Sequence, residues 1–374
     1  MERMNAMKYR CSLLGCLLIF LATSAYPIKV PGVRGVPGSV EFGFGARLDI
    51  WGSDITSSFL AARTLGLDWV ALEFNWERIW PDANTDPDLA TFEQAMVLAE
   101  RYGISVLVSI TNPAGWAMTG QGPNPELTSQ LVYNLASQYP RTIFAIELFP
   151  GANTVQGWGA PPNPMAYTTV LVKTQTALQT LDHSVIIVVG GLAPGSSNSI
   201  PGEIDDLNFL QGLYDAGAKS YISTVGVYLE VIDSNLMTAS SGNERRVFRH
   251  YEDLRQVMLK NQQVEGNLWV TGFSMPVDFY SSNASAELQA QWLVDAYQLM
   301  RSQLYIGVAF YNCMNLSEKS SQNGACSSLV QPGAIHHPVF EVLKRLITIS
   351  HGNSNASLQN RRLKQMILTV ALKP

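Results

Sequence analysis

The sequence predicts a single-domain α/β protein, a (β/α)8 TIM barrel over residues 40–348, and three observations support this prediction. Eight short apolar runs of the β type follow one another along the chain. Segments with helical periodicity lie between them, which is the element order of a (β/α)8 barrel. Several of the runs are continuously apolar, as is typical of strands buried on both faces. An open doubly wound sheet is the alternative, but "GFGARLD" has only two glycines of the dinucleotide-binding fingerprint.

The predicted strands are runs rich in valine, isoleucine and aromatic residues, and each is bounded by polar or turn-forming residues. In chain order, we expect them at residues 40–46, 68–74, 104–110, 142–149, 184–191, 222–229, 268–273 and 305–311.

Three of the intervening helices are the clearest. Residues 245–262 carry one apolar stripe at helical spacing, and residues 286–301 carry another. A third helix is expected over residues 338–347, after the last strand, with Pro338 in its first turn, where proline is tolerated.

The two ends of the chain are expected to lie outside the barrel. Lys8 and Arg10 precede an apolar run over residues 11–22, which is the order of a secretory signal, so we predict a signal peptide over residues 1–25. An uncleaved membrane anchor is the alternative. Residues 26–39 are rich in proline and glycine and predict a linker, and residues 349–374 predict a C-terminal tail. The protein is therefore expected to be secreted or extracytoplasmic.

The amino-acid composition restricts the kinds of partner that are expected. Charged residues make up only 15% of the chain and the net charge is −5, so nothing indicates nucleic-acid binding. We expect no cofactor and no metal site. Cys313 and Cys326 are the two cysteines outside the signal, and in an exported protein they predict a disulfide, with two free thiols as the alternative.

The working residues of such a barrel lie at the C-terminal ends of its strands and in the loops that follow. These positions are rich in aromatic rings and amides, which suit a carbohydrate because sugars present both CH faces and hydroxyls. The candidate ligand-binding residues are Trp76, Asn112, Trp116, Asn153, Trp158, Tyr228, Tyr311 and Asn312. Glu147 lies within an apolar strand, so it could instead be a structural carboxylate paired with Arg47 or Arg141.

Several segments resemble the retaining glycoside hydrolases with (β/α)8 barrels, especially their β-xylosidase-like branch. These segments are "LGLDWVALEFNWERIWP", "NPAGWA", "ELFPGAN" and "LWVTGF", and they occur in the family's order. The resemblance implies the same fold. It also implies where the two catalytic glutamates should be: the acid/base in the family's "EIWNEPN" and the nucleophile in its "WITEFG".

Both catalytic positions depart from the family's pattern. Laying "EIWNEPN" on "ELFPGAN" places Gly151 at the acid/base, and laying "TEFG" on "TGFS" places Gly272 at the nucleophile. The family's strand-6 "HPY" falls on Tyr228, Leu229 and Glu230, so its histidine and tyrosine are also replaced. Glycine has no side chain that could donate a proton or attack a sugar.

Three hypotheses follow from these replacements. The first is a catalytically silent barrel that binds a glycan or a related extracellular ligand in its cleft. The second is an active hydrolase with relocated carboxylates, for which the candidates are Glu147, Glu230 and Asp278, with Glu73 further off. The third is a structural or surface-interaction scaffold, because a fold does not fix a function.

Overall fold

The computed structural model describes residues 33–52, 54–195, 201–240, 245–276, 279, 285–312, 314–315, 329 and 338–352. Within this part of the chain, eight parallel strands close into one barrel in the order β1-β10-β9-β8-β7-β6-β3-β2. The predicted (β/α)8 fold is therefore confirmed. The strands are β1 (Gly43–Leu48), β2 (Trp69–Asn75), β3 (Ser105–Thr111), β6 (Ile143–Leu148), β7 (Ile186–Leu192), β8 (Thr224–Leu229), β9 (Asn267–Phe273) and β10 (Ile306–Tyr311).

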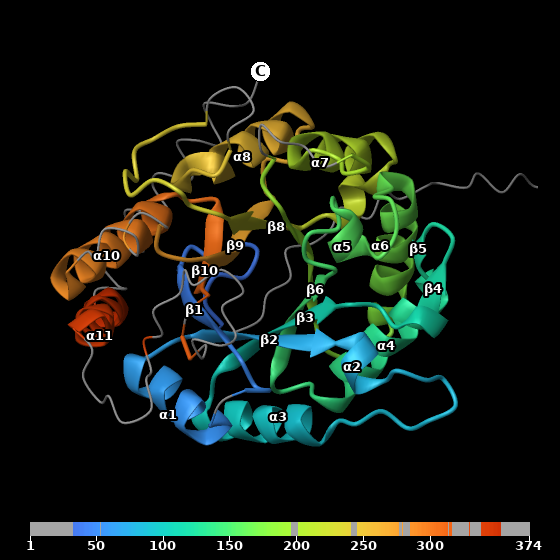
Figure 1. Cartoon of the computed structure of the whole chain (residues 1–374), viewed down its shortest axis with the longest axis horizontal. Coiled ribbons are helices and arrows are strands. Elements are labelled where there is room, and N and C mark those ends of the chain that lie inside the picture. The colour runs from blue at the N-terminus through green and yellow to red at the C-terminus, as the bar shows by residue number, and fades with distance from the viewer. Residues whose placement is uncertain are drawn as a thin grey trace, which may run out of the picture.

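Helices surround this barrel, as Figure 1 shows, with α10 and α11 on the left of the view, α7 and α8 at the top, and α4 and α6 on the right. The longer helices are α1 (Ile55–Leu65), α3 (Ala90–Tyr102), α4 (Pro125–Gln138), α6 (Pro164–Leu178), α7 (Asp206–Asp215), α8 (Tyr251–Lys260), α10 (Ala286–Ser302) and α11 (Pro338–Gly352). Two one-turn helices, α2 (Trp76–Ile79) and α5 (Val155–Trp158), lie in loops that follow strands. No helix in the described ranges is long and apolar enough to cross a membrane.

The inside of the barrel has two kinds of layer. Side chains alternate between the inner and outer faces of each strand, so every second residue points to the axis. Toward the N-terminal ends of the strands the interior is filled by an apolar cluster of Val36, Trp69, Ala71, Leu107, Ala145, Ile186, Val188, Trp269, Val308 and Phe310. Toward the C-terminal ends of the strands the inward residues become polar, and this is the end at which such barrels carry their sites.

Residues 34–36, within the predicted linker, pack against the N-terminal end of the barrel. The indole N–H of Trp69 donates to the carbonyl of Arg34 at 2.8 Å, and that of Trp269 donates to the carbonyl of Gly35 at 3.0 Å. Val36 is 4% exposed and belongs to the interior cluster. This stretch is therefore packed, and its glycine lets the backbone lie directly against the barrel.

Two predicted helix boundaries differ from the structure. The helix expected from residue 245 begins at Tyr251, after a 3-10 turn over Phe248–His250, because Val247 is still extended. The last helix continues to Gly352, so residues 349–352 of the predicted tail are helical. A small hairpin, β4 (Met118–Thr119) with β5 (Gly122–Pro123), lies between β3 and α4 and was not predicted. The predicted signal segment, residues 353–374 and both cysteines of the expected disulfide lie outside the described residues.

Candidate functional site

Glu147, near the end of β6, lies in a polar cluster at the centre of the barrel. Its Oε2 accepts from the hydroxyl of Ser109 at 2.5 Å, and its Oε1 accepts from the backbone N–H of Gly191 at 2.8 Å. The guanidinium of Arg47 approaches Oε2 at 3.5 Å, and it also donates to the carbonyl of Thr271 at 2.8 Å and to Ser109 at 3.0 Å. Glu147 is fully buried, so these partners and not water satisfy its carboxylate.

The cation beside Glu147 is Arg47 and not Arg141, which was the other sequence-based candidate. Arg141 lies on the outside of the barrel, where its side chain is 80% exposed and pairs with Glu100 at 2.6 Å. Arg47 is positioned by the alternation of β1, which points it to the axis at the same level as Glu147. The pair joins β1 to β6, which lie three strands apart around the barrel.

The chain leaves β6 through a tight turn that contains Gly151. Phe149 has a φ of +52°, which is an uncommon value for a residue with a side chain, and Gly151 has a φ of +71°. The N–H of Gly151 donates to the carbonyl of Gly191 at 2.8 Å, and this bond fixes the turn against β7. A Cβ at Gly151 would meet nothing closer than the Thr154 hydroxyl at 3.5 Å, so backbone conformation rather than space favours glycine here.

Gly272, near the end of β9, is glycine because two side chains pack over it. A Cβ there would lie 2.5 Å from Oδ1 of Asn312 and 2.7 Å from Cε2 of Tyr228. The amide of Asn312 donates to the hydroxyl of Tyr228 at 3.0 Å. The space beside Gly272 is therefore taken by a hydrogen-bonded tyrosine–asparagine pair.

The two remaining carboxylate candidates lie beside this pair or outside the described residues. Glu230 directly follows β8, and its side chain is exposed. Desolvation raises the pKa of the Tyr228 phenol, the negative charge of Glu230 raises it further, and Arg47 acts in the opposite direction. Asp278 lies outside the described residues. Glu73, the more distant candidate, accepts from the hydroxyl of Thr111 at 2.6 Å.

Of the eight predicted ligand-binding residues, four are inside the protein. Trp158 is fully buried, and its indole donates to the carbonyl of Gln121 at 2.8 Å. Trp76 and Tyr311 are buried in the main core. Asn153 is 3% exposed and binds the backbone of the loop after β7. Their described contacts are those of packing and loop-fixing side chains.

The other four predicted ligand-binding residues reach the surface, in two groups. Tyr228 is 38% exposed and forms one group with Asn312. Asn112 is exposed, and Trp116 is partly exposed. Trp116 packs edge-to-face on Trp80, with ring centroids 4.8 Å apart, and its indole donates to the carbonyl of Trp80. Sequence reasoning missed Trp80, which directly follows the short helix α2 and has non-helical backbone angles, so helical spacing gave no signal for it.

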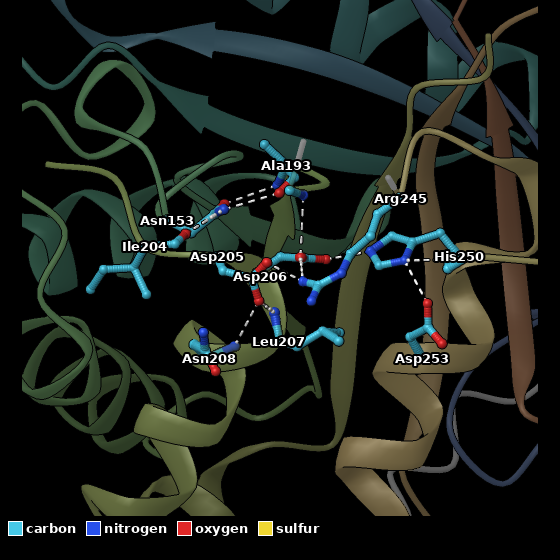
Figure 2. A network of polar contacts seen from close by, with 12 residues as sticks. Asn153, Ala193, Ile204, Asp205, Asp206, Leu207, Asn208, Arg245, His250 and Asp253 are labelled. Atoms are coloured by element: carbon cyan, nitrogen blue, oxygen red, sulfur yellow. Dashed lines mark hydrogen bonds and ion pairs between the residues drawn. The ribbon is translucent and has the colours of Figure 1, made fainter. Parts of the chain in front are cut away.

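A second polar network lies between the loops after β7 and β8, and Figure 2 shows it from close by. The fully buried His250 faces Asp206 through Nε2 at 2.5 Å and Asp253 through Nδ1 at 3.0 Å. Burial alone lowers the pKa of His250, but the hydrogen bonds to the two carboxylates outweigh burial and raise it to about 9. Sequence reasoning missed this network because Asp206 and His250 are 44 residues apart and no local pattern connects them.

The hydroxyl of Ser240 lies 3.4 Å from Nδ1 of His250, so serine, histidine and aspartate are grouped as in a hydrolytic triad. The position of His250 between two carboxylates argues against this chemistry. A general base must accept the serine proton. The ring of His250 is already protonated at both nitrogens, because a carboxylate faces each of them. The network therefore lacks the neutral imidazole that a triad needs as its base.

Asn153 connects a third loop to this region. Its amide donates to the carbonyls of Ala193 and Ile204, both at 3.0 Å, and its Oδ1 accepts from the N–H of Ala193 at 2.9 Å. The loop after β6 is thereby fixed to both ends of the loop after β7 (Figure 2). In the ranges that the structure describes, no group of three or more His, Cys, Asp or Glu side chains is arranged to hold a metal ion.

No protein-family model matches the sequence, and no curated protein matches it. Solved structures do match. A family 39 glycoside hydrolase from Bacteroides cellulosilyticus WH2 aligns with a TM-score of 0.61 and 16% identity, over 82% of this chain and 63% of its own. A glucosidase from Croceicoccus marinus aligns with a TM-score of 0.61 and 11% identity, over 83% of this chain and 68% of its own.

A third match is a family 30 endoxylanase from Clostridium papyrosolvens, with a TM-score of 0.53, 12% identity, and coverage of 82% of this chain and 71% of its own. The family 39 enzyme is covered over 63% of its length, so this chain spans less than two thirds of that protein. At these identities the likeness is one of fold. The resemblance stated from the sequence is confirmed at that level: the chain has the (β/α)8 barrel fold of the glycoside hydrolases.

Proposed function

We propose that the protein is an exported, glycoside-hydrolase-like barrel that binds a carbohydrate at the C-terminal mouth without cleaving it by the two-glutamate mechanism. The observation that supports this most directly is at Gly272. The family's nucleophile would project from this position, but Tyr228 and Asn312 pack over the glycine and bond to each other. The position of the nucleophile is therefore covered by a tyrosine and an asparagine, whose side chains are suited to binding a sugar rather than to attacking it.

The chemistry of retaining glycosidases explains why this matters. They use two carboxyl groups about 5–5.5 Å apart, one as nucleophile and one as acid/base. Glycine supplies neither. Glu147 is a poor substitute, because it is fully buried and each of its oxygens already accepts a hydrogen bond at 2.8 Å or less. Freeing its carboxylate for a sugar would leave Arg47 without its partner.

The accessible side chains at the mouth are suited to a sugar. Tyr228 offers a ring face and a hydroxyl, and Asn312 offers an amide beside it. Trp116 and Asn112 offer a similar combination on the loop after β3. Aromatic faces pack against sugar CH groups while amides and hydroxyls exchange hydrogen bonds with sugar hydroxyls.

A glycan-array screen of the purified chain from residue 26, followed by calorimetric titration of the best ligand, tests this proposal. Tyr228→Phe removes one hydroxyl from the mouth, so we expect the affinity to fall by about fivefold, the value of one neutral hydrogen bond. Tyr133→Phe, on the outer helix α4, is the matched control and should bind like the unmodified protein. Equal affinity of all three proteins would place the binding site elsewhere.

An active hydrolase with relocated carboxylates is the second candidate, and Glu230 is the residue that favours it. Glu230 is exposed directly after β8, and its charge acts on the phenol of Tyr228. This candidate requires turnover of a glycoside that is lost in Glu230→Gln. A complete absence of glycan binding and of turnover would instead support the scaffold hypothesis.

A further inference from the structure

We propose that protonated His250 is a latch that holds the loops after β7 and β8 together at the barrel mouth and releases them at alkaline pH. Here the β7 loop means residues 193–195 and 201–205, and the β8 loop means residues 230–240 and 245–247. Both loops border the strand that carries Tyr228. The proposal does not depend on which ligand, if any, the mouth binds.

The position of His250 between two carboxylates carries the proposal (Figure 2). Nε2 lies 2.5 Å from Oδ2 of Asp206, and Nδ1 lies 3.0 Å from Oδ2 of Asp253. Ionised carboxylates only accept hydrogen bonds, so both ring nitrogens must donate, and only the imidazolium can do this. Asp206 begins α7 at the end of the β7 loop, whereas His250 follows the β8 loop, so the bond between them joins the two loops.

Arg245 strengthens the same junction from within the β8 loop. Its Nη1 donates to Oδ1 of Asp206 at 3.0 Å, and it also pairs with Asp205. The N–H of Gly195, in the β7 loop, donates to the same Oδ1 at 3.3 Å. Each oxygen of Asp206 therefore binds the β8 side of the junction, and one of them binds the β7 loop as well.

The negative charges that surround His250 favour the protonated form of its ring. The groups around it are Asp206 and Asp205 from the start of α7, Arg245 from the β8 loop, Asp253 from α8, and the hydroxyl of Ser240. With the proton in place, three carboxylates stand against two cations. Without it, one ring nitrogen presents a lone pair to a carboxylate, and Arg245 is the one cation that remains among these groups for three carboxylates. A buried pair that loses one partner is strongly destabilised.

The sign of the pH effect follows from the direction of the shift. The pKa of His250 is raised from its ordinary value of 6.5 to about 9, so the folded protein keeps the proton where the unfolded chain has lost it. The stabilisation is fully present below pH 6.5 and is lost as the pH rises through 9. Over this window the folding equilibrium constant should fall by about two orders of magnitude.

Two measurements on the chain from residue 26 test the latch. Carbon-detected or proton NMR of the histidine ring gives the pKa of His250 directly, and a value above 8 is expected. Limited proteolysis by subtilisin between pH 7 and pH 10, normalised at each pH to the rate on a short unstructured peptide, reports opening of the two loops. We expect cleavage within residues 193–195, 201–206, 230–240 and 245–250 to accelerate at least tenfold across this range.

Three variants distinguish the effect of His250 from other effects of pH on the protein. His250→Gln removes the imidazolium, so its loops should already be cleaved rapidly at pH 7 and show little further dependence on pH. Asp253→Asn keeps the histidine but removes one carboxylate, so the transition should move to lower pH. His183→Gln is the control, because His183 lies outside the network, beside Asp182 on the surface. A His250 pKa below 8, or a normalised cleavage rate that is constant from pH 7 to pH 10 in the unmodified protein, would overturn the proposal.

Discussion

The substitution Glu147→Gln separates a structural carboxylate from a catalytic one. An amide has one acceptor oxygen and one NH2 group, whereas both oxygens of Glu147 accept hydrogen bonds. In one orientation the NH2 group faces the N–H of Gly191. In the other it faces Arg47 and Ser109. In either orientation Arg47 is left without a counterion. Both orientations place a donor against a donor in the barrel interior.

The size of the effect follows from burial. An unsatisfied buried donor costs about 1–3 kcal/mol, and breaking a buried ion pair costs about 3–5 kcal/mol. Because the Arg47 side chain is 23% exposed, water satisfies part of its charge, so we expect a loss of about 3 kcal/mol. At roughly 2 °C per kcal/mol in a domain of this size, the Tm should fall by about 6 °C.

Urea unfolding followed by tryptophan fluorescence measures this loss. Glu126→Gln is the control, because Glu126 forms a surface pair with Lys173 and its side chain is 64% exposed. Its loss should stay below about 1 kcal/mol. If Glu147→Gln unfolds at the same urea concentration as the unmodified protein, the carboxylate does not stabilise the barrel, and the reasoning about its role is wrong.

Three further substitutions or modifications test neighbouring claims. Gly272→Ala should cost about 1–3 kcal/mol in urea unfolding, since its Cβ would lie 2.5 Å from Asn312, whereas Gly120→Ala, with nothing within 4 Å, should be nearly neutral; equal effects would refute the close packing. Asn153→Ala should speed hydrogen exchange in the β7 loop, because three hydrogen bonds are lost, and unchanged exchange would contradict this. Asn315 is in an Asn-x-Ser sequon but is 5% exposed and donates to Ser58, so mass spectrometry after expression in a glycosylating host should find it unmodified, and an occupied site would refute its buried placement.

The strands were predictable because parallel barrel strands are apolar on both faces and need no partner to be recognised. Each of the eight predicted runs overlaps one strand, and the bounds differ by a few residues. The helices at 286–301 and 338–347 were equally clear, because each carries one continuous apolar stripe. The prediction was weaker where hydrogen bonds rather than periodicity set the structure, as at the 3-10 turn before α8.

The candidate site was less predictable, because burial is not encoded in residue type. Trp158 and Trp116 are both tryptophans in loops after strands, yet the first is fully buried and the second reaches the surface. The partners of Glu147 come from β1, β3 and β7, and barrel closure alone brings them together. The His250 network has the same origin, since its members are separated by 44 residues of sequence.

The most direct test of the central claim is a hydrolysis assay on the purified chain from residue 26, with a panel of aryl β-glycosides and the Glu147→Gln and Glu230→Gln variants beside it. The glycines at positions 151 and 272 leave no pair of carboxylates for the two-glutamate mechanism. We therefore predict that release of the aryl alcohol does not exceed the uncatalysed rate for any substrate. Turnover by the unmodified protein that disappears in Glu230→Gln would contradict the claim and establish a relocated catalytic carboxylate.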